Sequence, residues 1–190
     1  MDFLPSIELE TQQNPDAAII WLHGLGADGN DFAPIVPQLR LPGSLAVRFI
    51  FPHAPSIPVT INGGFIMPAW YDILEMHIDR KVDTVQLMQS AAKISALVNR
   101  ELERGISSKR IIIAGFSQGG AVAYQVALSS EIPFAGLLAM SSYFATADTI
   151  KLSEANKNIP IKIQHGIHDP VVPEALGQKA TTQLVKLGYR

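Results

Sequence analysis

The sequence predicts a single α/β domain in which a mostly parallel central sheet is covered by helices on both faces. Apolar runs alternate with helical patterns along the chain. The runs, such as AAIIWL and IIIAGF, are continuous rather than alternating, as expected of strands buried on both faces. A length of 190 residues with 47% hydrophobic content fits one domain, and we find no repeat, linker or low-complexity segment.

The expected elements follow this rhythm in chain order. We expect strands at residues 17–22, 46–51, 110–116, 135–140 and 161–165, and helices at 80–104, 118–128 and 174–187. In the first of these helices Ile94, Leu97, Val98 and Leu102 form one apolar stripe, and Gly105 ends it.

Composition excludes several classes of protein. The basic residues are scattered, and the pairs Arg80–Lys81 and Lys109–Arg110 are expected to be solvated helix and loop ends, so no nucleic-acid surface is predicted. The chain has no cysteine, which excludes disulfides and thiolate metal sites. The N-terminus does not read as a signal peptide, and no apolar run is long enough for stable membrane insertion. We therefore expect a cytoplasmic protein.

The segment IIIAGFSQGG at residues 111–120 carries the main functional signal. A β-branched run stops at a glycine-bracketed serine, and a small-residue helix follows at once. This is the pattern of a nucleophile elbow, in which a sharp turn exposes the Ser117 hydroxyl while Gly115 and Gly119 relieve crowding. The pattern favours covalent catalysis by Ser117 over a serine that only caps a helix.

A nucleophilic serine also needs donors for an oxyanion, and the loop HGLGADGND after the first strand can supply one. The N–H groups of Leu25 and Gln118 would form the oxyanion hole. His23 in this loop is expected to pack and hydrogen-bond locally. The loop also spells GxGxxG, but Pro34 and Pro37 interrupt the next segment and no acid ends the following strand, which argues against a dinucleotide site.

The acid that orients the catalytic base is expected on a later loop. The segment IKIQHGIHDPVVP places Asp169 between the last predicted strand and the last predicted helix, in the correct order after the serine. A turn or helix cap is the alternative role for Asp169. Asp148 and Glu154 are weaker candidates because they lie in a polar stretch that follows an earlier strand.

Four motifs, HGLGADG, FPHAPSIPVTINGGFIMPAWYDI, GFSQGG and HGIHDPVVP, occur in this order. With them the chain resembles the phospholipase/carboxylesterase family of α/β-hydrolases, which includes acyl-protein thioesterases and bacterial carboxylesterases, over essentially its whole length. The resemblance implies Ser117 as nucleophile, Asp169 as the acid of the triad, and oxyanion donors at Leu25 and Gln118. It also implies an acyl-binding groove, for which Trp70, Ile73, Tyr143 and Val171 are candidate lining residues; each could equally belong to the core.

The resemblance also implies a catalytic histidine beyond Asp169, after one more strand and before a closing helix. The sequence has no histidine after His168, so we expect the fold to lack its last strand and helix, with a strand edge and an apolar sheet face exposed. His168 adjoins Asp169 and would reach Ser117 only with a distorted turn. His53 and His77 are expected to pack or face solvent. Whether the tail is missing from this sequence or the natural chain ends early stays open.

The leading hypothesis is a serine carboxylesterase or acyl thioesterase that works through an acyl-enzyme and needs no metal or organic cofactor. Its substrate would be a small ester, an acylated protein or a lysophospholipid. The alternatives are a binding protein on a degenerate hydrolase fold, for which the missing histidine argues, and a lactone or peptide hydrolase on the same scaffold. The resemblance also suggests a homodimer, for which the sequence offers no test.

Overall fold

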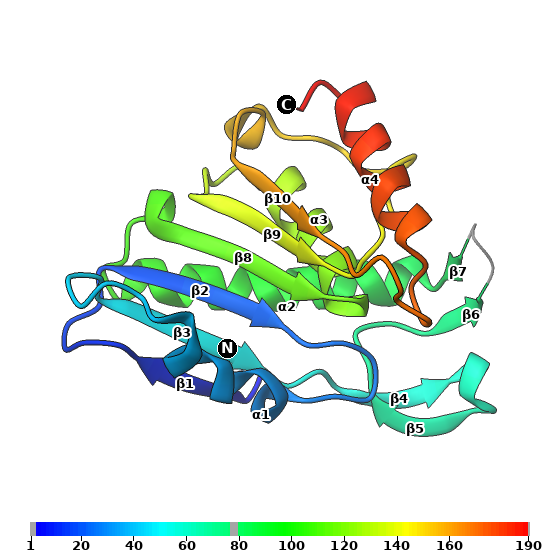
Figure 1. The fold of residues 1–190 in the computed structure, drawn as a ribbon, viewed down its shortest axis with the longest axis horizontal. Helices are drawn as coiled ribbons and strands as arrows, with labels where there is room; N and C mark the ends of the chain where they lie inside the picture. The colour runs from blue at the N-terminus through cyan, green and yellow to red at the C-terminus, as the bar shows by residue number, and fades with distance from the viewer. Residues whose placement is uncertain (1–2, 77–79, 190) are drawn as a thin grey trace.

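A twisted six-stranded sheet runs through the centre of the protein (Figure 1). The computed structural model describes residues 3–76 and 80–189. All neighbouring strands of this sheet are parallel except the first, which pairs antiparallel with the second in spatial order. Across the sheet the strands are β1 (Ser6–Glu10), β3 (Val47–Pro52), β2 (Ala17–Leu22), β8 (Ile111–Phe116), β9 (Gly136–Met140) and β10 (Ile161–Gln164).

Helices lie on both faces of the sheet, as the sequence predicts. One face carries α2 (Thr84–Glu103), α3 (Gln118–Ser129) and α4 (Glu174–Lys186), whose apolar side chains join the larger core cluster. The other face carries α1 (Gly29–Phe32) and the 3₁₀ helix η1 (Ala33–Leu39) over a smaller cluster. Side chains alternate between the faces along each strand, so that Ile113 points to the first cluster and Ala114 to the second.

The predicted elements are confirmed with one exception. The five predicted strands agree with the observed ones to within one residue at each end, and so do the helices α3 and α4. The helix predicted from residue 80 begins only at Thr84, because Lys81–Val82 forms strand β7 against β6 (Ile73–Glu75). Asp83 then caps α2 by accepting a hydrogen bond from the Gln86 N–H at 2.9 Å.

Several short elements escaped the sequence analysis. They are α1, β1, the hairpins β4 (Ser56–Val59) with β5 (Phe65–Pro68) and β6 with β7, and the 3₁₀ helices η1, η2 (Thr60–Asn62), η3 (Ser108–Arg110) and η4 (Glu154–Asn156). The β4–β5 hairpin projects from the molecule in Figure 1. Among the described residues no helix combines the length and the apolar character needed to cross a bilayer.

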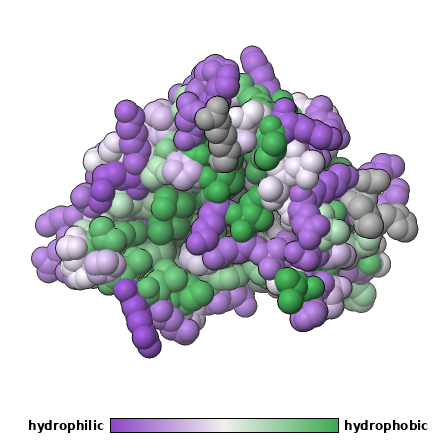
Figure 2. Space-filling view, turned by 45° about the horizontal axis from the view of Figure 1, so that its top comes forward, coloured by the Kyte–Doolittle hydropathy of each residue, from purple (hydrophilic) through white to green (hydrophobic). Residues whose placement is uncertain are grey.

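The sheet face opposite α2 and α3 carries an open apolar hollow. It has a volume of about 530 Å³ and runs across β2, β8, β9 and β10, where Trp21, Ile112, Leu138 and Met140 line it. Hydrophobic residues gather in a broad patch in Figure 2. Among the described strands β10 forms one edge of the sheet. An apolar sheet face and an unpaired edge are what the sequence analysis expects.

A buried carboxylate ties α2 to the sheet and gives the first prediction. The Glu101 side chain is fully buried and accepts from Arg48 at 2.7 Å and from Arg104 at 2.9 Å. Replacing Glu101 by glutamine is expected to lower the free energy of unfolding by about 3 kcal/mol, because the buried Arg48 guanidinium then keeps only the more exposed Glu10 as a charged partner. Urea denaturation measures this. The exposed pair Lys157–Glu154 provides the control: Glu154→Gln should leave stability nearly unchanged, and equal effects for the two variants would contradict this account.

Candidate active site

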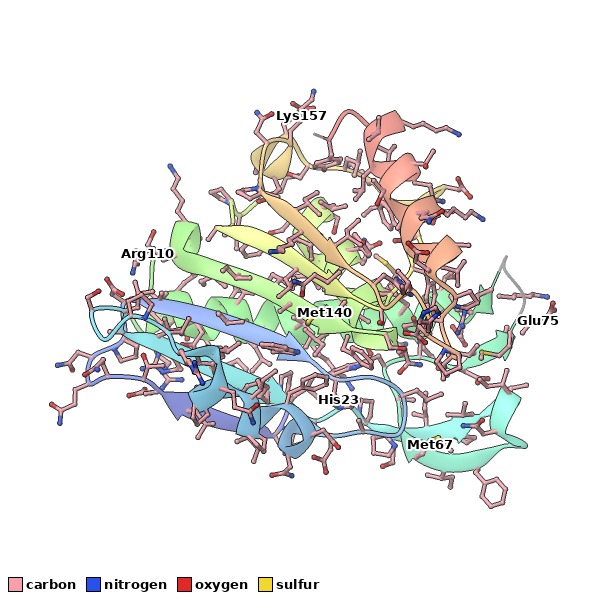
Figure 3. All side chains as sticks on the ribbon, viewed as in Figure 1. His23, Met67, Glu75, Arg110, Met140 and Lys157 are labelled. Carbon is pink, nitrogen blue, oxygen red and sulfur yellow. The ribbon has the colours of Figure 1, made fainter. Side chains whose placement is uncertain are left out.

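Four loops leave the same edge of the sheet, because the carboxyl ends of its parallel strands lie there. They follow β2, β8, β9 and β10 and carry Leu25, Ser117, Ser141 and Asp169 in turn. In Figure 3 His23 marks the end of β2 and Met140 the end of β9. The topology therefore brings together Leu25, Ser117 and Asp169, which the sequence assigns to one site, and adds Ser141.

Ser117 occupies a strained turn between β8 and α3. Its φ of 53° and ψ of −118° lie in a region that non-glycine residues rarely adopt. Two hydrogen bonds hold the turn: the Ser117 N–H donates to the Met140 carbonyl at 2.8 Å, and the Ser142 hydroxyl donates to the Ser117 carbonyl at 2.7 Å. The Ser117 side chain does not cap α3. This geometry is that of a nucleophile elbow, and it disfavours the alternative in which Ser117 is only a helix cap.

Glycines let the turn pack against the sheet. A Cβ on Gly119 would lie 2.5 Å from the His23 carbonyl oxygen, and one on Gly115 would lie 2.5 Å from the Gly119 carbonyl carbon. Both positions therefore require glycine, as predicted. The structure adds Gly120, where a Cβ would lie 2.5 Å from Cβ of Ser142. Gly120 was not predicted, because its contact joins two segments that are distant in the chain.

The loop after β2 approaches Ser117 closely. A Cβ on Gly24 would come within 3.4 Å of the Ser117 Cβ. Within the loop the Gly26 N–H donates to the Pro68 carbonyl at 2.8 Å, and the Ala27 N–H donates to the Gly24 carbonyl. Leu25 lines the same cavity as Ser117, and Gln118 is the first residue of α3, whose N–H the helix itself does not use. Leu25 thus shares a cavity with Ser117, and Gln118 follows Ser117 directly; that their N–H groups bind an oxyanion stays a prediction.

The same loop does not form a phosphate site despite its GxGxxG spacing. The helix that follows, α1, spans only four residues. Its cap is already a carboxylate, because Asp28 accepts a hydrogen bond from the Asn30 N–H at 2.7 Å. A bound pyrophosphate would meet this negative charge where the helix N-terminus should receive it.

The Gln118 side chain performs a second task that the sequence did not indicate. The side chain is buried; its Oε1 accepts from the Trp70 N–H at 2.8 Å, and its Nε2 donates to the Tyr71 carbonyl at 2.6 Å. Two bonds to one backbone segment fix both the amide plane and the start of α3. The long segment between β3 and α2 is thereby anchored to the residue that follows the nucleophile.

Asp169 lies on the loop between β10 and α4 and lines the cavity that contains Ser117. Its Oδ1 accepts hydrogen bonds from the Val171 and Val172 N–H groups, both at 2.9 Å. Burial opposes ionisation of Asp169, but these two N–H groups and the nearby Ser141 hydroxyl favour the carboxylate, and the pKa lies below its ordinary value. Asp169 is therefore an ionised, oriented carboxylate, as the acid of a triad must be.

None of the four described histidines lines the cavity around Ser117. His53 Nδ1 accepts from the Gly29 N–H at 3.2 Å, and His165 Nε2 donates to the Val172 carbonyl at 2.7 Å. The His168 side chain is exposed. His77, which we expected to pack or face solvent, lies outside the described residues. A base for Ser117 is therefore not found among the described histidines.

His23 is a packed residue, as the sequence predicts. Its Nε2 accepts from the Ala54 N–H at 3.1 Å, so Nδ1 carries the proton that bonds to the Gly24 carbonyl at 2.7 Å. The ring also packs on Trp70, with 5.0 Å between the ring centroids. Burial lowers the pKa of His23 below 6.5, against the opposing effect of the Gly24 carbonyl.

The low pKa of His23 predicts a loss of stability on mild acidification. As the pH falls through 6.5, the unfolded chain binds a proton that the folded chain excludes. The free energy of unfolding should then fall by up to about 1.4 kcal/mol per pH unit, an effect absent well above pH 6.5. Urea denaturation over this range tests it: His23→Gln should flatten the slope and the exposed-site control His168→Gln should not. Equal slopes for His23→Gln and the unchanged chain would refute this assignment.

The cavity beside Ser117 has a volume of about 410 Å³ and mainly apolar walls. Its lining residues are Gly24, Leu25, Ala27, Asp31, Phe32, Phe116, Ser117, Asp169, Val171 and Val172. The cavity therefore offers apolar surface directly beside Ser117. Three His, Cys, Asp or Glu side chains arranged to hold a metal ion do not occur in the described part of the chain.

Of the four residues expected to line the groove, one lines the cavity beside Ser117 and three do not. Val171 lines the cavity and is exposed. Trp70 and Ile73 belong to the core, with 1% and 3% of their surface exposed, and Trp70 donates its indole N–H to the His23 carbonyl at 2.8 Å. Tyr143 is also buried and borders a different, smaller cavity of about 140 Å³. Trp70, Ile73 and Tyr143 therefore do not line the cavity beside Ser117, which agrees with the alternative that these large side chains belong to the core.

A strained serine after a parallel strand, with an oxyanion loop and an oriented carboxylate at the same sheet edge, defines the α/β-hydrolase class. The match to the phospholipase/carboxylesterase family extends over residues 5–189, and the chain belongs to this family. The chain is 40% identical to acyl-protein thioesterase 1 of Neurospora crassa, over 91% of this chain and 75% of that protein. It is 34% identical to acyl-protein thioesterase 1 of Cryptococcus neoformans, over 98% of this chain and 81% of that protein.

Solved structures agree with this fold. Acyl-protein thioesterase 2 of Zea mays superposes with a TM-score of 0.83 and 28% identity, covering 97% of this chain and 85% of that chain. Arabidopsis thaliana SOBER1 superposes with a TM-score of 0.84 and 28% identity, covering 91% of this chain and 84% of that chain.

Proposed function

We propose that this chain hydrolyses carboxylic ester or thioester bonds through an acyl-enzyme on Ser117. The observation that carries the proposal is the strained Ser117 turn, which lines a cavity with apolar walls together with Leu25 and Asp169. Membership of the phospholipase/carboxylesterase family supports it.

In the proposed cycle the Ser117 oxygen attacks the acyl carbonyl carbon while a base removes its proton. The N–H groups of Leu25 and Gln118 stabilise the oxyanion, and the alcohol or thiol leaves with a proton from that base. Water then attacks the acyl-enzyme in the same way and releases the acid. Asp169 would orient and stabilise the base, a role supported by its ionised state and its position in the cavity.

The acyl-protein thioesterase relatives favour an acylated protein or a small ester as substrate. Comparison of oxyesters and thioesters of increasing acyl length, with amides and lactones as controls, tests this class. We expect turnover of oxyesters and thioesters that depends on Ser117, and much lower turnover of amides and lactones. Turnover of amides at rates comparable to esters would contradict the proposal and favour a peptide hydrolase.

A second candidate is a binding protein that holds an acylated ligand without turnover. The absence of a described histidine from the cavity favours it. Equilibrium binding of a non-hydrolysable acyl ketone separates the two candidates. Saturable binding that persists unchanged in Ser117→Ala, with no serine-dependent turnover under any condition, would favour the binding protein.

A further inference from the structure

Arg80 holds a position that its sequence context does not predict. It was expected at a solvated helix end, but it lies ahead of α2 and is half-buried. Its Nη2 donates to the Val171 carbonyl at 2.6 Å, and its guanidinium lies over the ring of Tyr143, 5.0 Å from the centroid. The β6–β7 segment is thereby joined to the loop that carries Asp169. These two segments are 91 positions apart in the chain.

The Arg80 guanidinium donates to the peptide unit between Val171 and Val172. The carbonyl of Val171 and the N–H of Val172 belong to the same peptide bond, and that N–H donates to Asp169 Oδ1 at 2.9 Å. A cation on the carbonyl side polarises the amide and strengthens the donation on the other side. Arg80 and Asp169 therefore hold opposite ends of one peptide plane.

The Tyr143 ring, on which Arg80 stacks, is linked through Tyr71 to Gln118, the residue that follows Ser117. The Tyr71 hydroxyl bonds to the Tyr143 hydroxyl at 2.7 Å and donates to the Gln118 carbonyl at 3.5 Å, so the Tyr143 hydroxyl is the donor of the first bond. Burial raises the pKa of both tyrosines, which keeps both hydroxyls neutral. The contacts run without a break from the start of α3 to the Asp169 loop.

Arg80 is not committed to a carboxylate within the described part of the chain. The ion pairs found there involve other cations, and Arg80 Nε is buried with no described hydrogen-bond partner. The bond to the Val171 carbonyl, the stacking on Tyr143 and a bond from Nη1 to the Met76 sulfur at 3.2 Å are its described contacts.

We propose that Arg80 is a positioning residue for Asp169, which holds the Val171–Val172 peptide so that its N–H orients the Asp169 carboxylate. The role rests on the proposed function, in which Asp169 is the acid of the site. The geometry of the clamp is independent of catalysis and can be tested without turnover.

Amide hydrogen exchange and carboxyl NMR of the whole chain provide the test. In Arg80→Met, the Val172 amide should exchange about tenfold faster or more, because the carbonyl of its peptide loses a charge-assisted bond. The pKa of Asp169 should rise, because a weakened N–H donor stabilises the carboxylate less. His165 also faces Asp169, so its titration is followed in the same spectra.

Two further variants keep the result interpretable. Arg110→Met removes an arginine that pairs with Asp16 at the amino ends of β2 and β8, away from the Asp169 loop. This variant should change neither the Val172 exchange rate nor the Asp169 pKa. Arg80→Lys keeps the charge and most of the stem, so its Val172 exchange rate and its Asp169 pKa should lie between those of the unchanged chain and those of Arg80→Met. This variant remains measurable even where Arg80→Met folds poorly. Unchanged Val172 exchange and an unchanged Asp169 titration in folded Arg80→Met would overturn the clamp, and so would an Arg80→Lys variant that departs from the unchanged chain as far as Arg80→Met does. Failure of Ser117 to accept an acyl group would instead count against the proposed function and leave the clamp standing.

Discussion

Replacing Ser117 by alanine is expected to abolish hydrolysis of p-nitrophenyl butyrate above the level of the solution reaction. Among the described residues that line the cavity, Ser117 is the one that carries a hydroxyl, and it occupies the strained turn. Loss of the nucleophile of a complete triad costs on the order of 10⁶ in turnover, and in this chain the loss is limited to the rate that a supplied base restores. The two proteins are compared by the release of p-nitrophenol, measured with imidazole added as the base.

Ser142 offers a matched control for this substitution. Its hydroxyl lies close by but donates to the Ser117 carbonyl, and it supports the turn without facing the cavity. Ser142→Ala should therefore retain far more activity than Ser117→Ala. Retention of most activity by Ser117→Ala would remove the basis of the proposed function.

The second large effect concerns the base. A polypeptide of residues 1–190 is expected to turn over p-nitrophenyl butyrate slowly, because no described histidine lines the cavity at Ser117. The loss relative to a complete triad should again be on the order of 10⁶, since an unassisted hydroxyl is a poor nucleophile. The purified chain, with its mass confirmed, tests this directly.

Exogenous imidazole should restore part of that activity. The cavity beside Ser117 has a volume of about 410 Å³, which leaves room for a small base next to the serine. The rate should rise with imidazole and saturate, whereas Ser117→Ala with imidazole should show only the solution reaction. Ordinary esterase rates without imidazole would mean that a histidine of this chain, His168 or His77, serves Ser117 after all.

The sequence predicted the elements whose signal is local. Strands β2 and β8 are short continuous apolar runs, and Ser117 sits where a run meets two glycines and a small-residue helix. These patterns depend on neighbours within a few residues, so they predict the local structure without any knowledge of distant contacts. The start of α2 was wrong because Lys81–Val82 pairs with a strand that precedes it, and periodicity alone does not report such pairing.

The residues that support the site depend on contacts between distant segments. Gln118 reads as a helix residue, yet its side chain binds the backbone at Trp70 and Tyr71. Arg80 reads as a solvated end, yet it binds Val171. Tyr143 was expected in the groove and lies under Arg80 instead. Each of these placements is decided by the meeting of loops at one sheet edge, which spacing along the chain does not encode.

The most direct test of the central claim is the identification of the acylated residue. The chain is incubated with p-nitrophenyl butyrate in the presence of imidazole, quenched at low pH and mapped by peptide mass spectrometry. The account predicts one butyryl group on Ser117, and none on the same peptide of Ser117→Ala. Butyrylation confined to other residues, or equal labelling of both proteins, would contradict it.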